Sequence, residues 1–434
     1  MNDSNNKQLP VNAAMRVAVV DLLFCWPPNG GADVDIYNVA ATLHARGVDV
    51  RMFVLQFDGV PGRGQVAADA VPFPLEVITV PQDTRDPGAI ADAVRAQVDK
   101  WAPTAVFLAH GYALKPWIAL ALSHYPLVGR YYAHELLCAR NALRFREGAS
   151  CSTDYLRRPD RCRRCAIESL GPEIRSGTWQ AWTQDFVIAG AHTPRYYDTA
   201  RQALDAMTRI IVSNNSLRQE MGQWRDKTMV IPGGVQAEAF TQGNDAEEEP
   251  QAQQKKIIFM AGRAEDPLKG LEVLLAAGTG LAKKRSDFHI RATHFDTRRA
   301  TELFSATGWL SQEETRAHYR QAAICVVPSL WHEPFGLVAV EAMAAGRPVC
   351  ASDSGGLRDI VVHEETGFLF PPGDADALAG ALERLLDSPA LCQRMGRAGQ
   401  ERARTLFTWD AVIDRHYLPL LHALEQERDD RERK

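Results

Sequence analysis

The stretch that decides the fold is Trp331-His332-Glu333-Pro334-Phe335-Gly336-Leu337-Val338-Ala339-Val340-Glu341-Ala342-Met343-Ala344-Ala345-Gly346. It follows residues 324–327, a short apolar run that predicts a buried strand. From Leu337 onward the residues are mostly small and apolar, which predicts a helix, and Gly346 is a suitable C-terminal stop. The sequence therefore predicts a strand, a Pro-Phe-Gly turn and a helix in direct succession.

Two carboxylates bracket this turn, because Glu333 stands before the predicted helix and Glu341 lies within it. Between them come the backbone N–H groups of a helix N-terminus, those of Phe335, Gly336, Leu337 and Val338. Such groups bind anions readily, and a glycine lets a ligand approach the backbone closely. We expect a phosphate at the turn and a hydroxyl-binding acid on each side, which matches a nucleotide-sugar. The alternative is an ordinary strand-loop-helix with two solvated acids.

Length, composition and charge describe an ordinary globular protein of two or three domains. The net charge of -5, from 49 basic and 54 acidic residues, argues against general nucleic-acid binding. Residues 1–10 lack the apolar core of a signal peptide, and no apolar run is long enough to span a bilayer. We therefore expect a cytoplasmic protein, at most peripheral to a membrane, in a compartment that disfavours disulfides.

The first half alternates strands and helices. Residues 16–20 and 48–55 predict strands, and residues 33–46 between them predict a helix, which is the spacing of a βαβ crossover in a parallel sheet. Gly30-Gly31 follows the first strand, at the usual ligand edge of such sheets, although the dinucleotide fingerprint is absent. Further strands are predicted at residues 75–80, 105–109, 128–133, 209–213 and 229–232, with helices at residues 89–101, 113–124 and 177–208.

Two histidines, His110 and His134, stand at the C-terminal ends of predicted parallel strands. Ligands of such sheets bind at this edge, and histidine is a versatile proton carrier and hydrogen-bonding group. Each has the alternative interpretation of an ordinary loop histidine whose hydrogen bonds are satisfied within the protein.

Residues 138–175 interrupt the alternation and hold half of the eight cysteines, namely Cys138, Cys151, Cys162 and Cys165. The last two have C-x-x-C spacing, and four thiols close together in a reducing compartment fit a structural zinc site, or less readily an iron–sulfur site. Free thiols are the alternative. Nine arginines in the same segment predict a basic surface, which either meets an anionic acceptor or is simply solvated.

The second half repeats the alternation after a polar, acidic linker at residues 236–254. Its strands are predicted at residues 257–261, 289–293, 324–327 and 349–352, with helices at residues 271–282, 312–322, 375–386 and 391–405 and a final helix at residues 409–427. The chain is thus expected to form two Rossmann-like halves with a cleft between their strand ends.

Arg263 and Lys269 flank the loop after the first strand of this second half. Two fixed cations, together with the amides of the turn after Glu333, can neutralise a diphosphate without a metal ion. A nucleoside diphosphate is the leaving group of a sugar transfer, and its developing negative charge requires such stabilisation. Glu341 is expected to accept hydrogen bonds from the ribose hydroxyls, and Glu333 to reach the hydroxyls of the transferred sugar.

The segment from Glu333 to Glu341 resembles the E-x7-E motif of retaining glycosyltransferases of the GT-B fold, family 4. Other segments resemble motifs of the same family in the same order: Gly30-Gly31, His134 after Tyr131-Tyr132-Ala133, Val212-Ser213, Ile231-Pro232-Gly233-Gly234-Val235, Gly262-Arg263, Lys269-Gly270, Gly355-Gly356 and Thr366-Gly367-Phe368-Leu369. Two positions depart from the common pattern, Asp359 and Gly233, and the cysteine-rich insertion is not general to the family.

The resemblance implies an α/β protein with two Rossmann-like domains facing across a deep cleft. The expected division is a disordered tail at residues 1–14, an acceptor domain at 15–215, a nucleotide-sugar domain at 235–408, and a helix at 409–434 that crosses back to the first domain. It implies His134 and Glu333 as catalytic residues, and a donor site formed by Gly30, Gly31, Arg263, Lys269, Phe335, Gly336, Leu337, Val338 and Glu341. No cofactor is expected for catalysis, and the nucleotide-sugar is a co-substrate.

Three hypotheses follow. The first is a retaining glycosyltransferase acting on an acceptor that is a small molecule, a glycan or a lipid-linked group. The second is a nucleotide-sugar epimerase of the same fold, and the third is a non-catalytic protein that binds a sugar nucleotide. A NAD-dependent dehydrogenase is disfavoured because neither half has the dinucleotide fingerprint.

Overall fold

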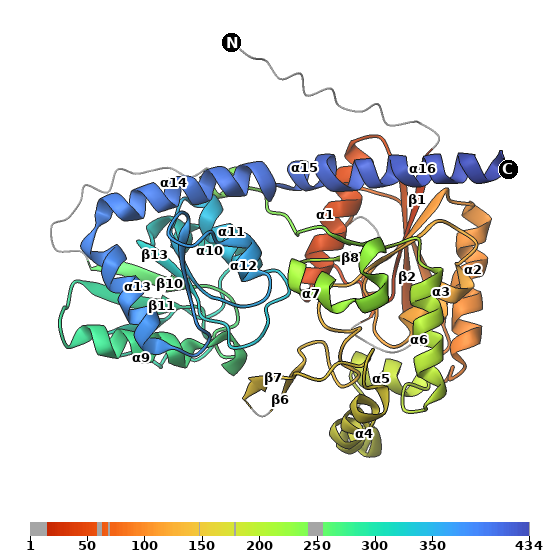
Figure 1. The fold of residues 1–434 in the computed structure, drawn as a ribbon, viewed down its shortest axis with the longest axis horizontal. Helices are drawn as coiled ribbons and strands as arrows, with labels where there is room; N and C mark the ends of the chain where they lie inside the picture. The colour runs from red at the N-terminus through yellow and green to blue at the C-terminus, as the bar shows by residue number, and fades with distance from the viewer. Residues whose placement is uncertain are drawn as a thin grey trace, which may run out of the picture.

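The computed structural model describes residues 15–58, 63–67, 70–146, 148–177, 179–241 and 255–433. It has two α/β domains joined along one side by long helices near the C-terminus (Figure 1). The predicted tail at residues 1–14 and most of the predicted linker at 236–254 lie outside the described residues. Among the described helices, none combines the length and the apolar composition that crossing a membrane requires.

The N-terminal domain is built on a seven-stranded parallel sheet with the order β3-β2-β1-β4-β5-β8-β9. Its strands are β1 Arg16–Asp21, β2 Asp49–Phe57, β3 Leu75–Val80, β4 Ala105–Leu108, β5 Leu127–Arg130, β8 Arg209–Val212 and β9 Thr228–Val230. Parallel strands that are covered on both faces need continuous apolar runs, and β4 and β5 are buried at every residue.

Helices cover both faces of this sheet. The helices are α1 Gly31–Ala45, α2 Pro87–Trp101, α3 Lys115–Ala121, α6 Arg195–Ala206, α7 Asn215–Glu220 and the 3₁₀ turn η1 Gly222–Lys227. Helices α2, α3 and α6 share one apolar core with the sheet, whereas α1 packs into the core on the opposite face. The crossovers therefore wind around the sheet as predicted from the βαβ spacing.

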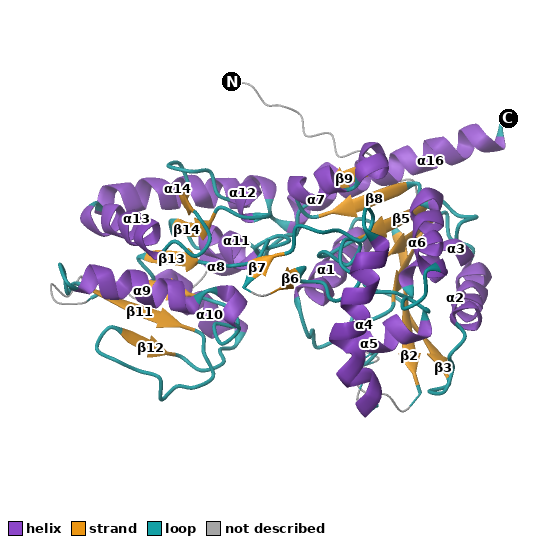
Figure 2. Cartoon of the chain, turned by 60° about the horizontal axis from the view of Figure 1, so that its bottom comes forward, coloured by secondary structure: helices purple, strands orange, loops and turns teal. Residues whose placement is uncertain are grey.

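The segment between β5 and β8 differs most from the predictions. It contains a short hairpin, β6 Phe145–Arg146 with β7 Ala149–Ser150, and the helix α4 Pro159–Ser176, where no element was predicted (Figure 2). The continuous helix predicted at residues 177–208 is wrong. It divides into α5 Ala181–Ile188 and α6, because Gly190 adopts a φ of 68° that ends the first helix and Pro194 directly precedes the second.

The C-terminal domain has a six-stranded parallel sheet with the order β12-β11-β10-β13-β14-β15. Its elements are α8 Glu238–Thr241, β10 Lys256–Met260, η2 Pro267–Lys269, α9 Leu271–Ala282, β11 Phe288–Ala292, β12 Phe304–Ala306, α10 Gln312–Gln321, β13 Ile324–Val327, α11 Leu337–Ala344, β14 Val349–Ser352, α12 Leu357–Ile360, β15 Gly367–Phe370, α13 Ala375–Asp387 and α14 Pro389–Leu406. Helices α9 and α13 cover one face, and α10 and α11 cover the other. The predicted α/β class with two Rossmann-like halves is confirmed.

The end of the chain continues beyond α14 onto the N-terminal domain. It consists of α15 Trp409–Val412, a π-helical turn at Ile413–Tyr417 and α16 Leu418–Glu432 (Figure 1). Apolar residues of this segment join the core that α1 shares with the first sheet. Arg46 adds hydrogen bonds to the carboxylates of Asp410 at 2.7 Å and Asp414 at 3.1 Å. The last segment thus contributes to the core of the first domain.

Gly270 fixes the position of the loop that carries Lys269. It has a φ of 79°, and a Cβ atom at this residue would lie 2.0 Å from the carbonyl oxygen of Pro328. The N–H of Leu330 donates a hydrogen bond of 2.8 Å to the carbonyl of Leu268 beside it. The loop after β10 and the loop after β13 are therefore in direct backbone contact, which only glycine permits at this point.

Gly270→Ala is expected to lower the urea midpoint of the C-terminal domain, with a loss of about 2 kcal/mol or more, because the new Cβ overlaps the Pro328 carbonyl. The matched control is Gly280→Ala in helix α9, where a Cβ meets no atom within 4 Å. The control should stabilise by about 0.4–1 kcal/mol. Equal effects of the two substitutions would contradict this packing argument.

Candidate functional site

The turn before α11 is held by the N-terminal domain. The carbonyl of Pro334 accepts hydrogen bonds from Ser213 Oγ and Asn214 Nδ2, both at 2.6 Å and both from the segment after β8. Gly336 then starts the helix with a φ of 108°, a conformation that favours glycine. The first N–H groups of α11 have no partners within the helix, so they can bind an anion.

His134 comes from the turn after β5 and crosses to the same loop. Its Nε2 lies 3.1 Å from the carbonyl oxygen of His332. Burial lowers the pKa of His134 to about 4, so its imidazole is neutral near pH 7. Since a carbonyl only accepts, Nε2 carries the proton, and the buried Nδ1 atom has no hydrogen-bond partner among the described residues. That nitrogen is able to accept a hydrogen bond from a hydroxyl group.

Glu333 is buried and forms an ion pair with Lys269. Its Oε1 lies 2.8 Å from Lys269 Nζ, and its Oε2 accepts a hydrogen bond of 3.1 Å from Ser329 Oγ. The ammonium also lies 5.3 Å from the centre of the Trp331 ring. The structure thus brings the predicted catalytic acid and a predicted diphosphate-binding cation into direct contact.

Arg263 lies in the loop after β10 and is exposed. The preceding Gly262 has a φ of 100°, and a Cβ there would lie 3.7 Å from Val338 in the first turn of α11. This loop therefore lies beside the N-terminus of α11. Lys269, at the end of η2, contacts the side chain of Glu333, which stands in the turn before α11. The two predicted cations and the predicted amides belong to neighbouring segments of the C-terminal domain.

Glu341 lies in the second turn of α11 and contacts Tyr319 of α10. The hydroxyl of Tyr319 lies 2.9 Å from Glu341 Oε2 and 3.2 Å from the carbonyl of Val338. Burial raises the pKa of Glu341 to about 7, although the hydrogen bond from Tyr319 acts in the opposite direction. The carboxyl group is therefore close to half ionised at neutral pH.

Gly30 and Gly31 lie in the loop between β1 and α1, where both are exposed and a Cβ at either meets no atom within 4 Å. The buried Asp33 shapes the loop by accepting hydrogen bonds from the N–H groups of Asn29 at 2.9 Å and Gly30 at 3.2 Å. Helix α1 approaches the turn before α11 near Gly233, because a Cβ at that glycine would meet both the Phe335 ring of this turn and Asp35 of α1.

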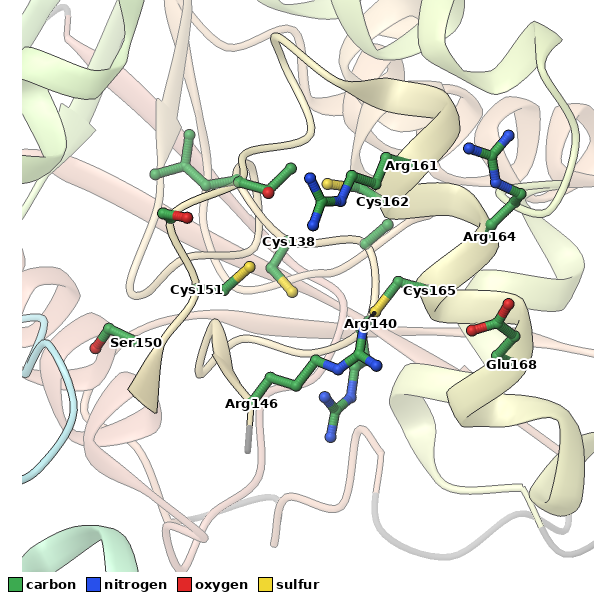
Figure 3. Close-up of a pocket in the computed structure, with 14 residues that line it drawn as sticks. Cys138, Arg140, Arg146, Ser150, Cys151, Arg161, Cys162, Arg164, Cys165 and Glu168 are labelled. Carbon is green, nitrogen blue, oxygen red and sulfur yellow. Dashed lines mark hydrogen bonds between the residues drawn. The ribbon is translucent and has the colours of Figure 1, made fainter. Parts of the chain in front are cut away.

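The four cysteines of the insertion line one cavity together with arginine side chains (Figure 3). Within the described part of the chain, no group of three or more His, Cys, Asp or Glu side chains is arranged to hold a metal ion. The zinc site expected from Cys138, Cys151, Cys162 and Cys165 therefore stays a prediction. The other predicted histidine, His110, is partly buried and contacts the rings of Tyr112 and Tyr132 edge-on, and desolvation lowers its pKa to about 3.

Three residues at the site were not singled out in the sequence: Asn214, Tyr319 and Ser329. Asn214 adjoins Ser213, which the resemblance included, but its contact with Pro334 spans 120 residues of sequence. Tyr319 reaches Glu341 from a different helix. Ser329 stands four residues before Glu333 in the same loop, and a serine in a loop does not by itself predict a contact with a carboxylate. Only the folded chain brings these partners together.

Part of this chain is similar in sequence to known proteins. Residues 296–402, which include the turn and α11, match the family model described as glycosyl transferases group 1. Two curated relatives are the MMP alpha-(1->4)-mannosyltransferase of Mycolicibacterium hassiacum, 32% identical over 49% of this chain and 53% of its own, and the phosphatidyl-myo-inositol mannosyltransferase of Mycobacterium leprae, 34% identical over 47% of this chain and 56% of its own. The chain spans about half the length of the curated relatives it matches.

Solved structures resemble the whole fold. The sucrose-phosphate synthase of Thermosynechococcus elongatus aligns with a TM-score of 0.61 at 23% identity, covering 94% of this chain and 100% of that structure. Anabaena Alr3699/HepE in complex with UDP-glucose aligns with a TM-score of 0.60 at 17% identity, covering 94% of this chain and 100% of that structure. These likenesses confirm the predicted GT-B fold.

A double-mutant cycle on Lys269 and Glu333 should give a coupling of about 1–3 kcal/mol in the free energy of unfolding. Lys269→Met leaves the buried Glu333 carboxylate without its counter-charge, whereas the combination with Glu333→Gln removes both charges. The exposed pair Arg384 and Glu364, 2.9 Å apart, is the control and should couple by less than about 1 kcal/mol. Additive effects at Lys269 and Glu333 would show that the ion pair does not form in solution.

Proposed function

We propose that this chain, whose residues 296–402 match the family model described as glycosyl transferases group 1, is a retaining glycosyltransferase that moves a sugar from a nucleotide-diphosphate sugar to an acceptor hydroxyl. The observation that carries the proposal is the meeting of His134, Glu333 and Lys269 at the turn before α11. A cation, a buried acid and a neutral imidazole are thereby placed around a helix N-terminus.

The diphosphate of the donor binds at the N-terminus of α11. Lys269 supplies a point charge, Arg263 supplies a bidentate fork, and the first amides of α11 point toward the same place. These groups stabilise the negative charge that develops on the leaving diphosphate, so the transfer proceeds without a metal ion. Lys269 is paired with Glu333, hence the diphosphate shares or takes over this ammonium when the donor binds.

The two acids of the motif have different partners and different roles. Glu341 accepts hydrogen bonds from the ribose hydroxyls, and Tyr319 orients its carboxyl group from the side of the protein. Glu333 is fixed by Lys269 and Ser329 and binds hydroxyls of the transferred sugar. The neutral His134, with its free Nδ1, accepts a hydrogen bond from the sugar or the acceptor and does not act as a general acid near pH 7.

Retention of the anomeric configuration follows from reaction on one face of the sugar. The acceptor oxygen forms a bond with the anomeric carbon while the bond from that carbon to the diphosphate oxygen breaks. The bonding electron pair leaves with the diphosphate, and the proton of the acceptor hydroxyl passes to a phosphate oxygen. The fixed cations and amides stabilise that leaving group throughout.

UDP-glucose, GDP-mannose and ADP-glucose are suitable first donors, since HepE was solved with UDP-glucose and two relatives are named mannosyltransferases. At least one of these three nucleotide-sugars should bind to the protein in calorimetry and be hydrolysed slowly by it.

Glu341→Gln should weaken donor binding about tenfold through the lost ribose contacts, and Glu333→Gln should lower turnover at least a hundredfold with little change in binding. Absence of binding and hydrolysis for every donor would reject the proposal, and a donor recovered with unchanged mass but altered configuration would favour an epimerase.

Donor affinity is expected to rise with pH between about 6 and 8. Glu341 must be ionised to accept two hydroxyl hydrogen bonds, and its raised pKa of about 7 means that the protonated form dominates below this value. Calorimetry with an intact nucleotide-sugar, whose phosphates do not titrate in this range, should show a total loss of up to about tenfold in affinity as the pH falls from 8 to 6. Glu341→Gln should abolish this dependence, and an equally steep dependence in that variant would assign it to another group.

A further inference from the structure

Two aromatic side chains at the edge of the C-terminal sheet are largely in water. Among the described residues, Phe295 and Trp309 are the most exposed of the large hydrophobic side chains, at 61% and 68%. Phe295 stands in the loop after β11 and Trp309 in the loop after β12, the strand at the edge of the sheet (Figure 2). Their rings are parallel within 13° and their centroids lie 5.5 Å apart, which is an offset stack. A pair so exposed adds little to the core, and its surface is available to a ligand.

The chain fixes the position of Trp309 from both sides. Before it, Gly308 has a φ of 77°, and its N–H donates a hydrogen bond of 3.2 Å to the carbonyl of His294. After it, Leu310 packs against the apolar core that includes α11, and Ser311 forms the capping box at the start of α10. An aromatic ring on such a fixed backbone loses little freedom when a ligand binds, which favours affinity.

The loops that carry the aromatic pair are bonded to the loop that carries Arg263. The carbonyl of Thr293 accepts a hydrogen bond of 3.1 Å from the N–H of Ala264, the residue after Arg263. The hydroxyl of Thr293 donates to the carbonyl of the residue before Arg263. The sheet order is β12-β11-β10-β13, so Trp309, Phe295 and Arg263 follow one another along one edge, and the turn before α11 comes next. The pair is therefore continuous with the proposed diphosphate site.

The proposed ribose site leads toward the same pair. The carboxyl group of Glu341 faces α10, because the hydroxyl of Tyr319 in that helix lies 2.9 Å from its Oε2 atom. Helix α10 begins at Gln312, directly after the loop that holds Trp309. A base attached to a ribose at Glu341 and directed away from the sugar extends along α10 toward that loop.

We propose that Phe295 and Trp309 form the stacking surface for the base of the donor nucleotide, and that this surface selects a purine. The inference rests on the proposed glycosyltransferase function and names the class of its donor, an ADP-sugar or a GDP-sugar. Aromatic side chains bind the flat face of a base, and stacking does not depend on the hydrogen-bonding groups at the edge of the base. The two fused rings of a purine cover more of the Trp309 indole than the single ring of a pyrimidine, and they remove more apolar surface from water.

The first test compares the binding of ADP, GDP, UDP and CDP to the full chain by calorimetry. ADP and GDP should bind with similar affinity, and each should bind at least about fivefold more tightly than UDP and CDP, since only the purines cover the indole.

The second test removes the stacking surface. Trp309→Ala should weaken ADP and GDP at least about tenfold and bring them to the level of UDP and CDP, whereas Trp309→Phe should restore most of the affinity. The ring is largely exposed, so the melting temperature of the free Trp309→Ala protein should stay within about 2 °C of the wild type. In donor hydrolysis the same substitution should raise KM and change kcat little, because stacking binds the ground state and the transition state equally.

Ile167→Ala is the matched control. Ile167 is the next most exposed large hydrophobic side chain among the described residues, and it lies in α4 of the N-terminal domain. This variant should bind all four nucleotides as the wild type does.

Two outcomes would overturn the inference. One is a wild-type protein that binds UDP or CDP as tightly as ADP and GDP, and the other is a Trp309→Ala protein that keeps the wild-type preference for purines. Hydrolysis of UDP-glucose, with UDP as the tightest nucleotide, would leave the proposed glycosyltransferase function in place and reject the purine assignment alone. Purine binding that depends on Trp309, without hydrolysis or transfer from any donor, would reject the function and support the stacking surface.

Discussion

The carbonyl of Pro334 accepts hydrogen bonds from Ser213 and Asn214, and the remaining features of the site depend on this contact between the domains. It fixes the turn before α11 against the end of β8. With the turn in place, the carbonyl of His332 meets the imidazole of His134. The residue between the two carbonyls, Glu333, is then held in a buried position by Lys269 and Ser329.

The same arrangement places the ion pair of Lys269 and Glu333 beside the proposed diphosphate site. Lys269 lies in a loop whose path is set by the contact of Gly270 with Pro328, and its ammonium lies 2.8 Å from Glu333 Oε1. A diphosphate at the N-terminus of α11 would compete with Glu333 for this cation. Donor binding would consequently release the carboxylate of Glu333 toward the sugar, which couples recognition of the leaving group to contact with the transferred group.

The sequence could predict elements whose signal is local. The alternation of apolar strands and helices indicated two parallel sheets, and the Glu333 to Glu341 segment indicated the turn and α11. The division of residues 177–208 into two helices depends on the backbone of Gly190, and α4 of the insertion is rich in polar residues and holds Pro172 in its interior. Tyr319 and Asn214 could not be predicted, because their partners are distant in sequence. The arginines were visible as a basic segment, whereas their common cavity is a property of the fold.

The central claim is that the diphosphate of the donor binds between Lys269, Arg263 and the first amides of α11. It is tested most directly by a crystal structure of the protein with an intact nucleotide-sugar, using the donor that calorimetry selects. The account predicts phosphate oxygens within hydrogen-bond distance of Lys269 Nζ and of the N–H groups at the start of α11, with the ribose hydroxyls on Glu341. A nucleotide bound elsewhere, with Lys269 still paired only to Glu333 and α11 uncontacted, would contradict the account.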